Sequence, residues 1–103
     1  MTEKNTAQSL LEKLTAGAKN TVTIDIQGVE FTFNKDAAAY DSMINEIESG
    51  NKITPIKDYL LAIVERTQRD ELLSIINVPG LALKIAGTVN KVLVPEIEVT
   101  VKN

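Results

Sequence analysis

The sequence contains no histidine and no cysteine. Without cysteine, the chain has no disulfide, no thiolate zinc site and no cysteine nucleophile. Without histidine, it lacks the commonest general base, the commonest transition-metal ligand and any Ser-His catalytic pair. Composition alone therefore excludes most familiar kinds of catalytic and metal-binding site, and no cofactor is expected.

Basic clusters and long apolar runs are also missing. The eleven Lys and Arg are scattered and the net charge is -3, so the basic stripe of a nucleic-acid binder is absent. The longest uninterrupted apolar run, Tyr59 to Val64, is too short to span a bilayer. Glu12 and Lys13 interrupt the apolar residues of the N-terminal segment, unlike those of a signal peptide. We expect a soluble, cytoplasmic protein that binds neither nucleic acid nor membrane.

The length and composition fit one compact domain. The chain has 103 residues, of which 44% are hydrophobic and 24% charged, values typical of a globular protein with a single core. We divide it into an N-terminal amphipathic helix extension, residues 1–20, and a single domain, residues 21–103.

The stretch TVTIDIQGVEFTFN contains two runs in which apolar and polar residues alternate. A two-residue turn at Gln27-Gly28 brings every apolar side chain of both runs onto one face, and this fixes the register. We therefore predict a hairpin over residues 21–33. Its expected apolar pairs are Val22–Phe33, Ile24–Phe31 and Ile26–Val29.

Apolar residues at helical spacing predict about four to five helices. The first expected helix is Thr6–Ala18, and the second begins after a cap at Asn34 or Asp36 and runs to about Glu48. The third runs from Pro55 to about Arg66, with Thr54 as its cap. The last two are the stretch QRDELLSIIN and a helix from about Gly80 to Leu93.

The C-terminal EIEVTVKN alternates again, with Ile97, Val99 and Val101 on one side. It predicts a strand over residues 96–102, which we place beside the hairpin. The expected fold is α+β, with a small three-stranded antiparallel sheet packed against the helices.

The predicted hairpin brings two acidic residues together. The hairpin register places Asp25 opposite Glu30 on the solvent face, and Glu98 of the third strand would lie near them. Such carboxylates can share a proton or hold a divalent cation. The alternative is an exposed face on which like charges carry a small cost, and a flat strand face offers no pocket that would desolvate them.

Two helices each carry a leucine that a single buried stripe does not require. Leu61 falls outside the main apolar face of its helix, with Val64 at the edge of that face, and Leu83 lies outside the face of the last helix. These leucines are isolated surface residues, or their helices are packed on two sides, or they form a protein-binding surface. The N-terminal helix adds Leu10, Leu11 and Leu14, which cover the core or reach a neighbouring subunit.

A series of segments runs from VEFTFN and YDSMINE through GNKITPIKDYLL and ELLSIINVPGLALKIAG to PEIEVTV. In order and spacing, over Val22 to about Lys102, they resemble a family of small phage tail assembly chaperones from tailed phages and prophages of Gram-negative bacteria. The most specific pieces are Phe31 to Asn34, Asn51-Lys52 with Pro55, and Pro79-Gly80 with the small residues after it.

The resemblance implies a non-enzymatic protein of the host bacterial cytoplasm. Such chaperones bind the long, largely helical tape-measure protein, keep it soluble, help recruit the tail-tube protein, and are absent from the finished virion. They often act as oligomers, so a homo-oligomer is expected. The N-terminal helix departs from the family's usual start at the hairpin; it is a candidate for self-association or for occupying the site of the tape-measure protein.

Two other functions compete with this one. The first is a structural or minor tail subunit that stays in the phage particle, where the small sheet adds strands to a neighbour. The second is a small enzyme or metal-binding protein that uses Asp25, Glu30 and Glu98.

Overall fold

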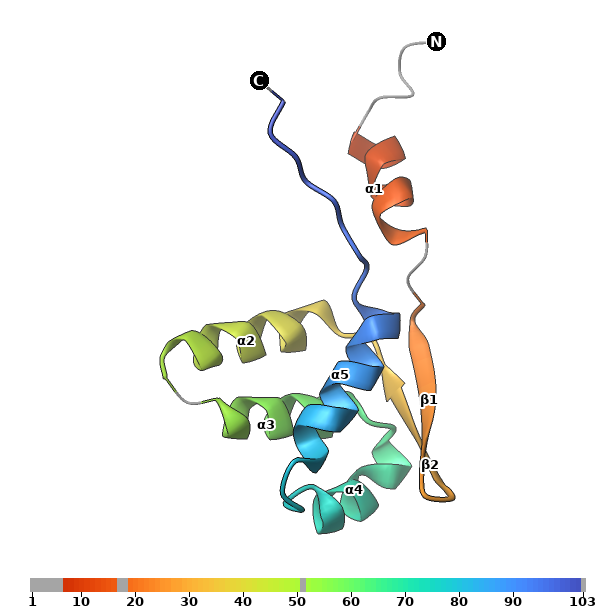
Figure 1. The fold of residues 1–103 in the computed structure, drawn as a ribbon. Helices are drawn as coiled ribbons and strands as arrows, with labels where there is room; N and C mark the ends of the chain where they lie inside the picture. Colours follow the sequence, from red (N-terminus) through yellow and green to blue (C-terminus); the bar gives the residue numbers. More distant parts are fainter. Residues whose placement is uncertain (1–6, 17–18, 51, 103) are drawn as a thin grey trace.

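A β-hairpin forms the sheet of this protein. The computed structural model describes residues 7–16, 19–50 and 52–102, and within them the strands are β1 (Thr21–Ile26) and β2 (Val29–Asn34), which pair antiparallel (Figure 1). The predicted register is confirmed, with the pairs Val22–Phe33, Ile24–Phe31 and Ile26–Val29 on the apolar face. In the turn, Gln27 has φ 50° and Gly28 φ 97°. Both lie in the left-handed region that a two-residue hairpin turn requires and that glycine adopts freely.

The described part of the chain contains five α-helices. They are α1 (Ala7–Thr15), α2 (Ala37–Glu48), α3 (Ile53–Ile63), α4 (Arg69–Ile75) and α5 (Leu81–Leu93), with a short 3-10 turn, η2 (Arg66–Gln68), before α4. Helices α2 to α5 pack around the hairpin, whereas α1 projects from one end of the body (Figure 1). Of the two predicted caps of α2, Asn34 and Asp36, the structure uses Asp36, whose carboxylate accepts a hydrogen bond from the Ala39 N–H at 3.0 Å. The predicted cap of α3 is wrong: the helix begins at Ile53, and Thr54 lies inside its first turn.

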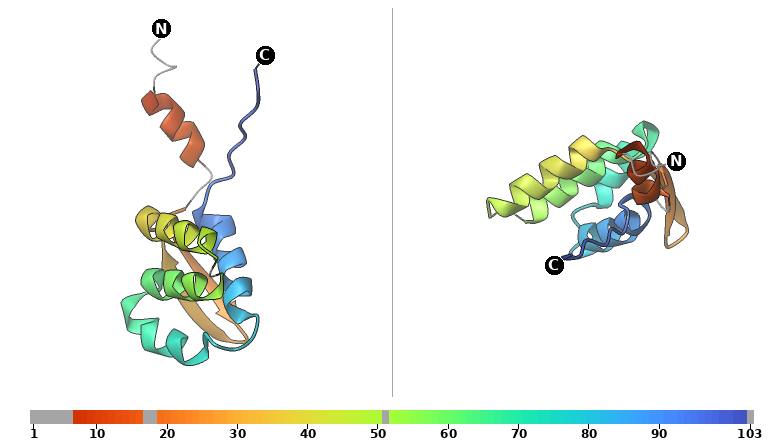
Figure 2. Two further views of the ribbon diagram at one scale, coloured as in Figure 1. Left: turned by 90° about the vertical axis from the view of Figure 1, so that its left-hand side faces the viewer. Right: turned by 90° about the horizontal axis from the view of Figure 1, so that it is seen from above.

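The third strand predicted over residues 96–102 does not form, so the sheet has two strands instead of three. The reason lies in where α5 ends. The Lys19 N–H donates to the Val92 carbonyl at 3.2 Å, which places the end of α5 beside the start of β1. An antiparallel strand would have to begin near Ile26, about 20 Å away along β1, and the two residues after α5 span only about 7 Å. The chain instead continues away from the body (Figures 1 and 2).

The core lies between the apolar face of the hairpin and helices α2 to α5. Its buried residues are Phe31, Phe33, Met43, Tyr59, Leu60, Leu61, Ile63, Val64, Leu72, Ile76, Ala82, Ile85, Ala86, Val89 and Leu93. The two strands contribute unequally. Phe31 and Phe33 of β2 are almost completely buried, whereas Val22, Ile24 and Ile26 of β1 are only partly buried.

The outer edge of β2 is closed by the segment that joins α3 to α4. The Glu65 N–H donates to the Thr32 carbonyl at 2.8 Å, just after a β-bridge between Val64 and Phe33. The side-chain amide of Gln68 then continues the pairing. Its Oε1 accepts from the Thr32 N–H at 2.8 Å, and its Nε2 donates to the Glu30 carbonyl at 2.9 Å. A glutamine side chain thus occupies the place of a neighbouring strand.

This arrangement predicts that Gln68→Ala lowers the free energy of unfolding by about 1–2 kcal/mol, because the part-buried Thr32 N–H loses its acceptor. Urea unfolding measures the loss, and hydrogen exchange at Thr32 is expected to accelerate. The exposed neighbour Thr67 supplies the control, since Thr67→Ala is expected to change stability by less than about 0.5 kcal/mol. Equal stability of the two variants would contradict the proposed role of Gln68.

Candidate protein-binding site

The structure separates the candidate binding residues into two groups. Leu61 and Val64 belong to the core, with 9% and 6% of their surface exposed. Helix α3 packs against α2, α5 and β2, so it is buried on more than one side and Leu61 needs no external partner to be covered. Of the three interpretations of Leu61, the structure supports the packing of its helix on two sides.

The other candidates lie at the surface. Leu83 is 53% exposed on α5, and Leu10 and Leu11 of α1 are 53% and 59% exposed, while Leu14 is half-buried. Helix α1 carries a strongly amphipathic pattern, yet none of its residues is buried. It rises from the same end of the body as the C-terminal segment (Figures 1 and 2). Its apolar stripe therefore lacks a covering partner in the described part of the chain.

A cavity of about 530 Å³ lies where α1, α2 and α5 approach one another. Leu14 and Lys13 line it from α1, and Tyr40 lines it from α2. The remaining lining residues belong to the second half of α5 and the residues that follow it: Gly87, Asn90, Lys91, Val94, Pro95 and Glu96. Leu10 precedes Leu14 by one helical turn on the same side of α1, so it extends this apolar surface toward the N-terminal end of the helix.

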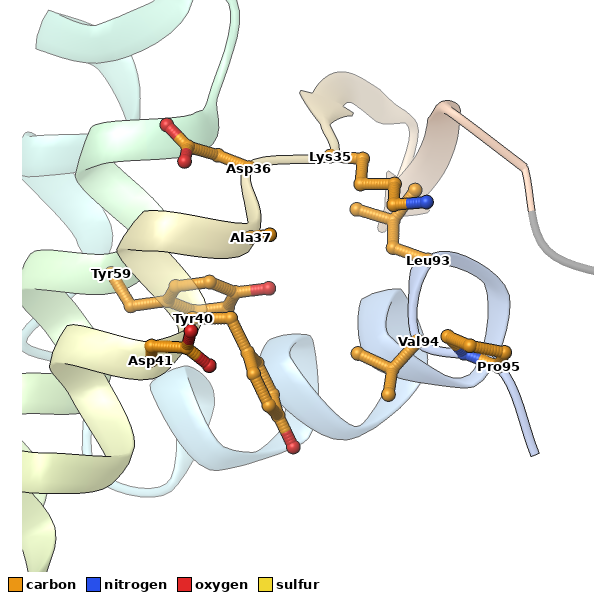
Figure 3. A pocket seen from close by; sticks show the side chains of 9 residues that line it. All are labelled: Lys35, Asp36, Ala37, Tyr40, Asp41, Tyr59, Leu93, Val94 and Pro95. Atoms are coloured by element: carbon orange, nitrogen blue, oxygen red, sulfur yellow. The ribbon is translucent and has the colours of Figure 1, made fainter. Parts of the chain in front are cut away.

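A second cavity, of about 210 Å³, adjoins the first and shares Tyr40, Val94 and Pro95 with it. Figure 3 shows Tyr40 and Tyr59 on one side of this cavity and Leu93, Val94 and Pro95 on the other. Its remaining lining residues are Lys35, Asp36, Ala37 and Asp41. We refer to the two cavities together as the α1–α5 groove. The surface of the smaller cavity is mostly apolar, whereas that of the larger cavity is mixed, with Asn90, Lys91 and Glu96 beside its apolar lining residues. Apolar surface with a few polar groups is typical of binding sites in proteins.

Tyr59 forms the floor of the smaller cavity. Its ring meets that of Tyr40 edge-on, with centroids 6.0 Å apart and planes at 71°. Its hydroxyl donates to the Asn90 Oδ1 at 2.7 Å and so ties α3 to α5. Burial, together with the smaller effects of the nearby Tyr40 and Asp36 side chains, raises the pKa of Tyr59 to about 12. The Tyr59 hydroxyl is therefore protonated and neutral at physiological pH.

Sequence reasoning did not identify the groove. Helical spacing places Tyr40 and Tyr59 on the apolar faces of their helices, and in the structure Tyr59 is buried and Tyr40 is partly buried against the core. That the two rings meet beside Pro95 depends on how α2, α3 and α5 pack. One signal was available: a tyrosine in an apolar stripe requires a polar partner for its hydroxyl, and Asn90 on another helix is such a partner.

The acidic pair of the hairpin lies where the register placed it. Asp25 is opposite Glu30, and both are exposed. The Asp25 carboxylate accepts a hydrogen bond from the Gly28 N–H at 2.7 Å, so it supports the turn. Glu98 does not join them, because the C-terminal segment is not paired with the hairpin. Among the described residues, no three acidic side chains gather into a group able to hold a metal ion.

Every helix in the described ranges is too short or too polar to span a lipid bilayer.

Comparison with known proteins gives two matches. Residues 22–103 match a family described as phage tail assembly chaperone. An uncharacterized 11.3 kDa protein from the lys 3′ region of Haemophilus phage HP1 (strain HP1c1) is 63% identical over 101 residues, which cover 98% of this chain and 99% of that protein. No solved structure matches the chain.

The two extra leucines differ in burial, so we expect them to respond differently to truncation. Leu61→Ala is expected to lower the free energy of unfolding by about 2–4 kcal/mol, because it leaves a cavity between α3 and its neighbours. Leu83→Ala is expected to change it by less than about 0.5 kcal/mol. Urea unfolding of the two variants measures both values. A stable Leu61→Ala protein would show that this position does not belong to the core.

The raised pKa of Tyr59 predicts a loss of stability at alkaline pH. Below pH 10, the ordinary tyrosine pKa, the phenol is protonated in both the folded and the unfolded state. As the pH rises toward 12, the unfolded chain loses this proton more readily than the folded protein, so unfolding becomes more favourable.

Tyr59→Phe is expected to cost about 1 kcal/mol at neutral pH through the lost bond to Asn90. It should also flatten the alkaline decrease, since phenylalanine does not ionise. Thermal unfolding across pH 8 to 12 measures both effects, and parallel curves for the two proteins would contradict the assignment.

Proposed function

Because the chain belongs to the phage tail assembly chaperone family, we propose that it binds the tape-measure protein of its phage, keeps it soluble and assists assembly of the tail tube. It acts without catalysis, in the cytoplasm of the host bacterium. The relative in phage HP1 is consistent with a phage origin. The observation that carries the proposal is the α1–α5 groove, which lies beside a helix with no buried residue.

A long helical protein presents apolar side chains at intervals of three to four residues along one face. Such a face binds by inserting its side chains into a groove lined by apolar residues. The α1–α5 groove offers two adjoining cavities of about 530 Å³ and 210 Å³, each able to accept side chains from a neighbouring helix. The apolar stripe of α1 supplies a second wall, so one helix of the partner would be covered from two sides.

The charges near the groove suit a partner with mixed charge. Lys13 and Lys91 line the larger cavity with Glu96, and Lys35 lines the smaller one with Asp36 and Asp41. Neither sign dominates, so apolar contact supplies most of the affinity and the charges fix the orientation of the bound helix. This pattern favours binding to many turns of a long client, where each site contributes a modest affinity.

The proposal predicts that Leu10→Glu weakens recovery of the tape-measure protein at least tenfold in a pull-down from cells that express both proteins. A charge in place of an apolar anchor costs more than the 1.4 kcal/mol that corresponds to a factor of ten. Leu73→Glu on α4 is the matched control, because Leu73 is 47% exposed and is not a lining residue of the groove. Circular dichroism should show that both variants remain folded.

Two results would contradict the proposal. The first is full recovery of the tape-measure protein by Leu10→Glu. The second is the presence of this chain in purified phage particles in amounts comparable to those of tail subunits, measured by mass spectrometry. That second result would favour a structural subunit retained in the particle.

A further inference from the structure

The outer edge of β1 has free hydrogen-bonding groups. On β2, the backbone groups of Glu30 and Thr32 point outward, since they bond to Gln68 and Glu65. Their partners across the hairpin are Asp25 and Thr23, whose N–H and C=O groups therefore point outward on the other side. The side chains of both are exposed, and no backbone partner lies along this edge within the described ranges. β1 thus presents an open strand edge, which natural proteins usually cover or pair.

The apolar side chains next to this edge are incompletely buried. Phe31 and Phe33 on β2 are 2% and 0% exposed, whereas their neighbours on β1 are only half-buried. The incompletely covered side chains are Val22, Ile24 and Ile26. One more strand with apolar residues at alternate positions would complete their burial.

The C-terminal segment has the properties of that missing strand. Residues 96–102 are extended but unpaired, and their apolar side chains alternate with polar ones. Ile97, Val99 and Val101 are 53%, 86% and 85% exposed. The segment is seven residues long, enough to pair with the whole of β1, which has six.

The segment does not reach the β1 edge of its own chain. It leaves α5 beside the start of β1 and runs away from the hairpin (Figures 1 and 2). A return would need a complete reversal at Val94-Pro95. Val94 is extended, with φ -103° and ψ 122°, as a residue before proline prefers, and no glycine follows Gly87.

We propose that the C-terminal segment of one copy adds to the open β1 edge of a second copy as a parallel third strand. The expected pairs on the apolar face are Ile97–Val22, Val99–Ile24 and Val101–Ile26. Exchange of an identical element between copies requires no surface beyond those already present in each chain. This inference concerns self-association and is independent of the proposed binding of the tape-measure protein.

Charge selects the parallel direction. In the antiparallel alignment with the same three apolar residues facing the core, Glu98 lies opposite Asp25, which already faces Glu30. Three carboxylates would then stand side by side, an arrangement that destabilises a sheet. In the parallel alignment, Thr100 lies opposite Asp25 and Glu98 opposite Thr23, so no like charges face each other.

The two directions use different backbone groups of the segment. In the parallel sheet, Thr23 bonds to the residues on either side of its partner, so the Val99 N–H donates to the Thr23 carbonyl and the Thr100 N–H points outward. In the antiparallel sheet, the Thr100 N–H points inward and that of Val99 outward. Because proline has no N–H, a proline at each position distinguishes the two directions.

The test compares the molar mass of the full chain with that of Val99→Pro and Thr100→Pro, measured by size-exclusion chromatography with light scattering. The wild-type chain and Thr100→Pro are expected to have at least twice the monomer mass, and Val99→Pro the mass of a monomer. Both positions lie outside the core, so circular dichroism should confirm that the body remains folded. A monomeric wild type, no effect of Val99→Pro, or a loss of association confined to Thr100→Pro would overturn the proposal.

Cross-linking then identifies the copy that supplies the strand. The chain has no cysteine, so Thr21→Cys and Glu96→Cys can be introduced singly in chains with tags of different size. These residues face each other in the proposed pairing, and mixing the two variants with a short thiol-reactive cross-linker should give a product that contains one chain of each. Lys102→Cys replaces Glu96→Cys in the control and should react poorly. Preferential reaction of Lys102→Cys would overturn the proposal. A variant that carries both Thr21→Cys and Glu96→Cys gives a second check, and cross-linking only within one chain would likewise overturn it.

Discussion

The closure of the outer edge of β2 is the interaction on which the rest of the structure depends. Val64, Glu65 and Gln68 occupy the place of a neighbouring strand, so the turn between α3 and α4 is held against the sheet. This position directs α3 across the apolar face of β2 and buries Phe31 and Phe33. It also leaves β1 as the only edge of the hairpin at which a further strand can add. The two edges of a small sheet thus have different roles, one closed by the chain's own helices and one open.

The hairpin was predictable because its determinants are local. Alternation on both sides of Gln27-Gly28 allows one register that keeps every apolar side chain on one face, and the structure has that register. The same holds for Asp36, whose carboxylate needs only a helix beginning directly after it. The α+β class followed from these elements, and the helices lie close to their expected positions.

Apart from the cap predicted at Thr54, which lies inside α3, the errors concern properties that only packing determines. A helical wheel assumes one buried face, so it left three interpretations of Leu61 open, and only the packing of α3 against several neighbours decides between them. The predicted third strand had the right pattern, but the direction of α5 takes residues 96–102 away from the hairpin. The α1–α5 groove was likewise hidden, since it arises where Tyr40, Tyr59 and Pro95 meet from three separate segments. Membership of the tail assembly chaperone family, by contrast, was recognisable from the order and spacing of several segments along the chain.

Both α1 and the C-terminal segment rise from one end of the body, while the Gln27-Gly28 turn lies at the other (Figure 1). This arrangement matters for anyone who labels or immobilises the protein. A fusion at either terminus would project from the end that holds the groove, and steric interference there would resemble a loss of binding. A fluorophore attached at Gln27, on the exposed tip of the hairpin, would stand clear of that end and report on complexes without obstructing them.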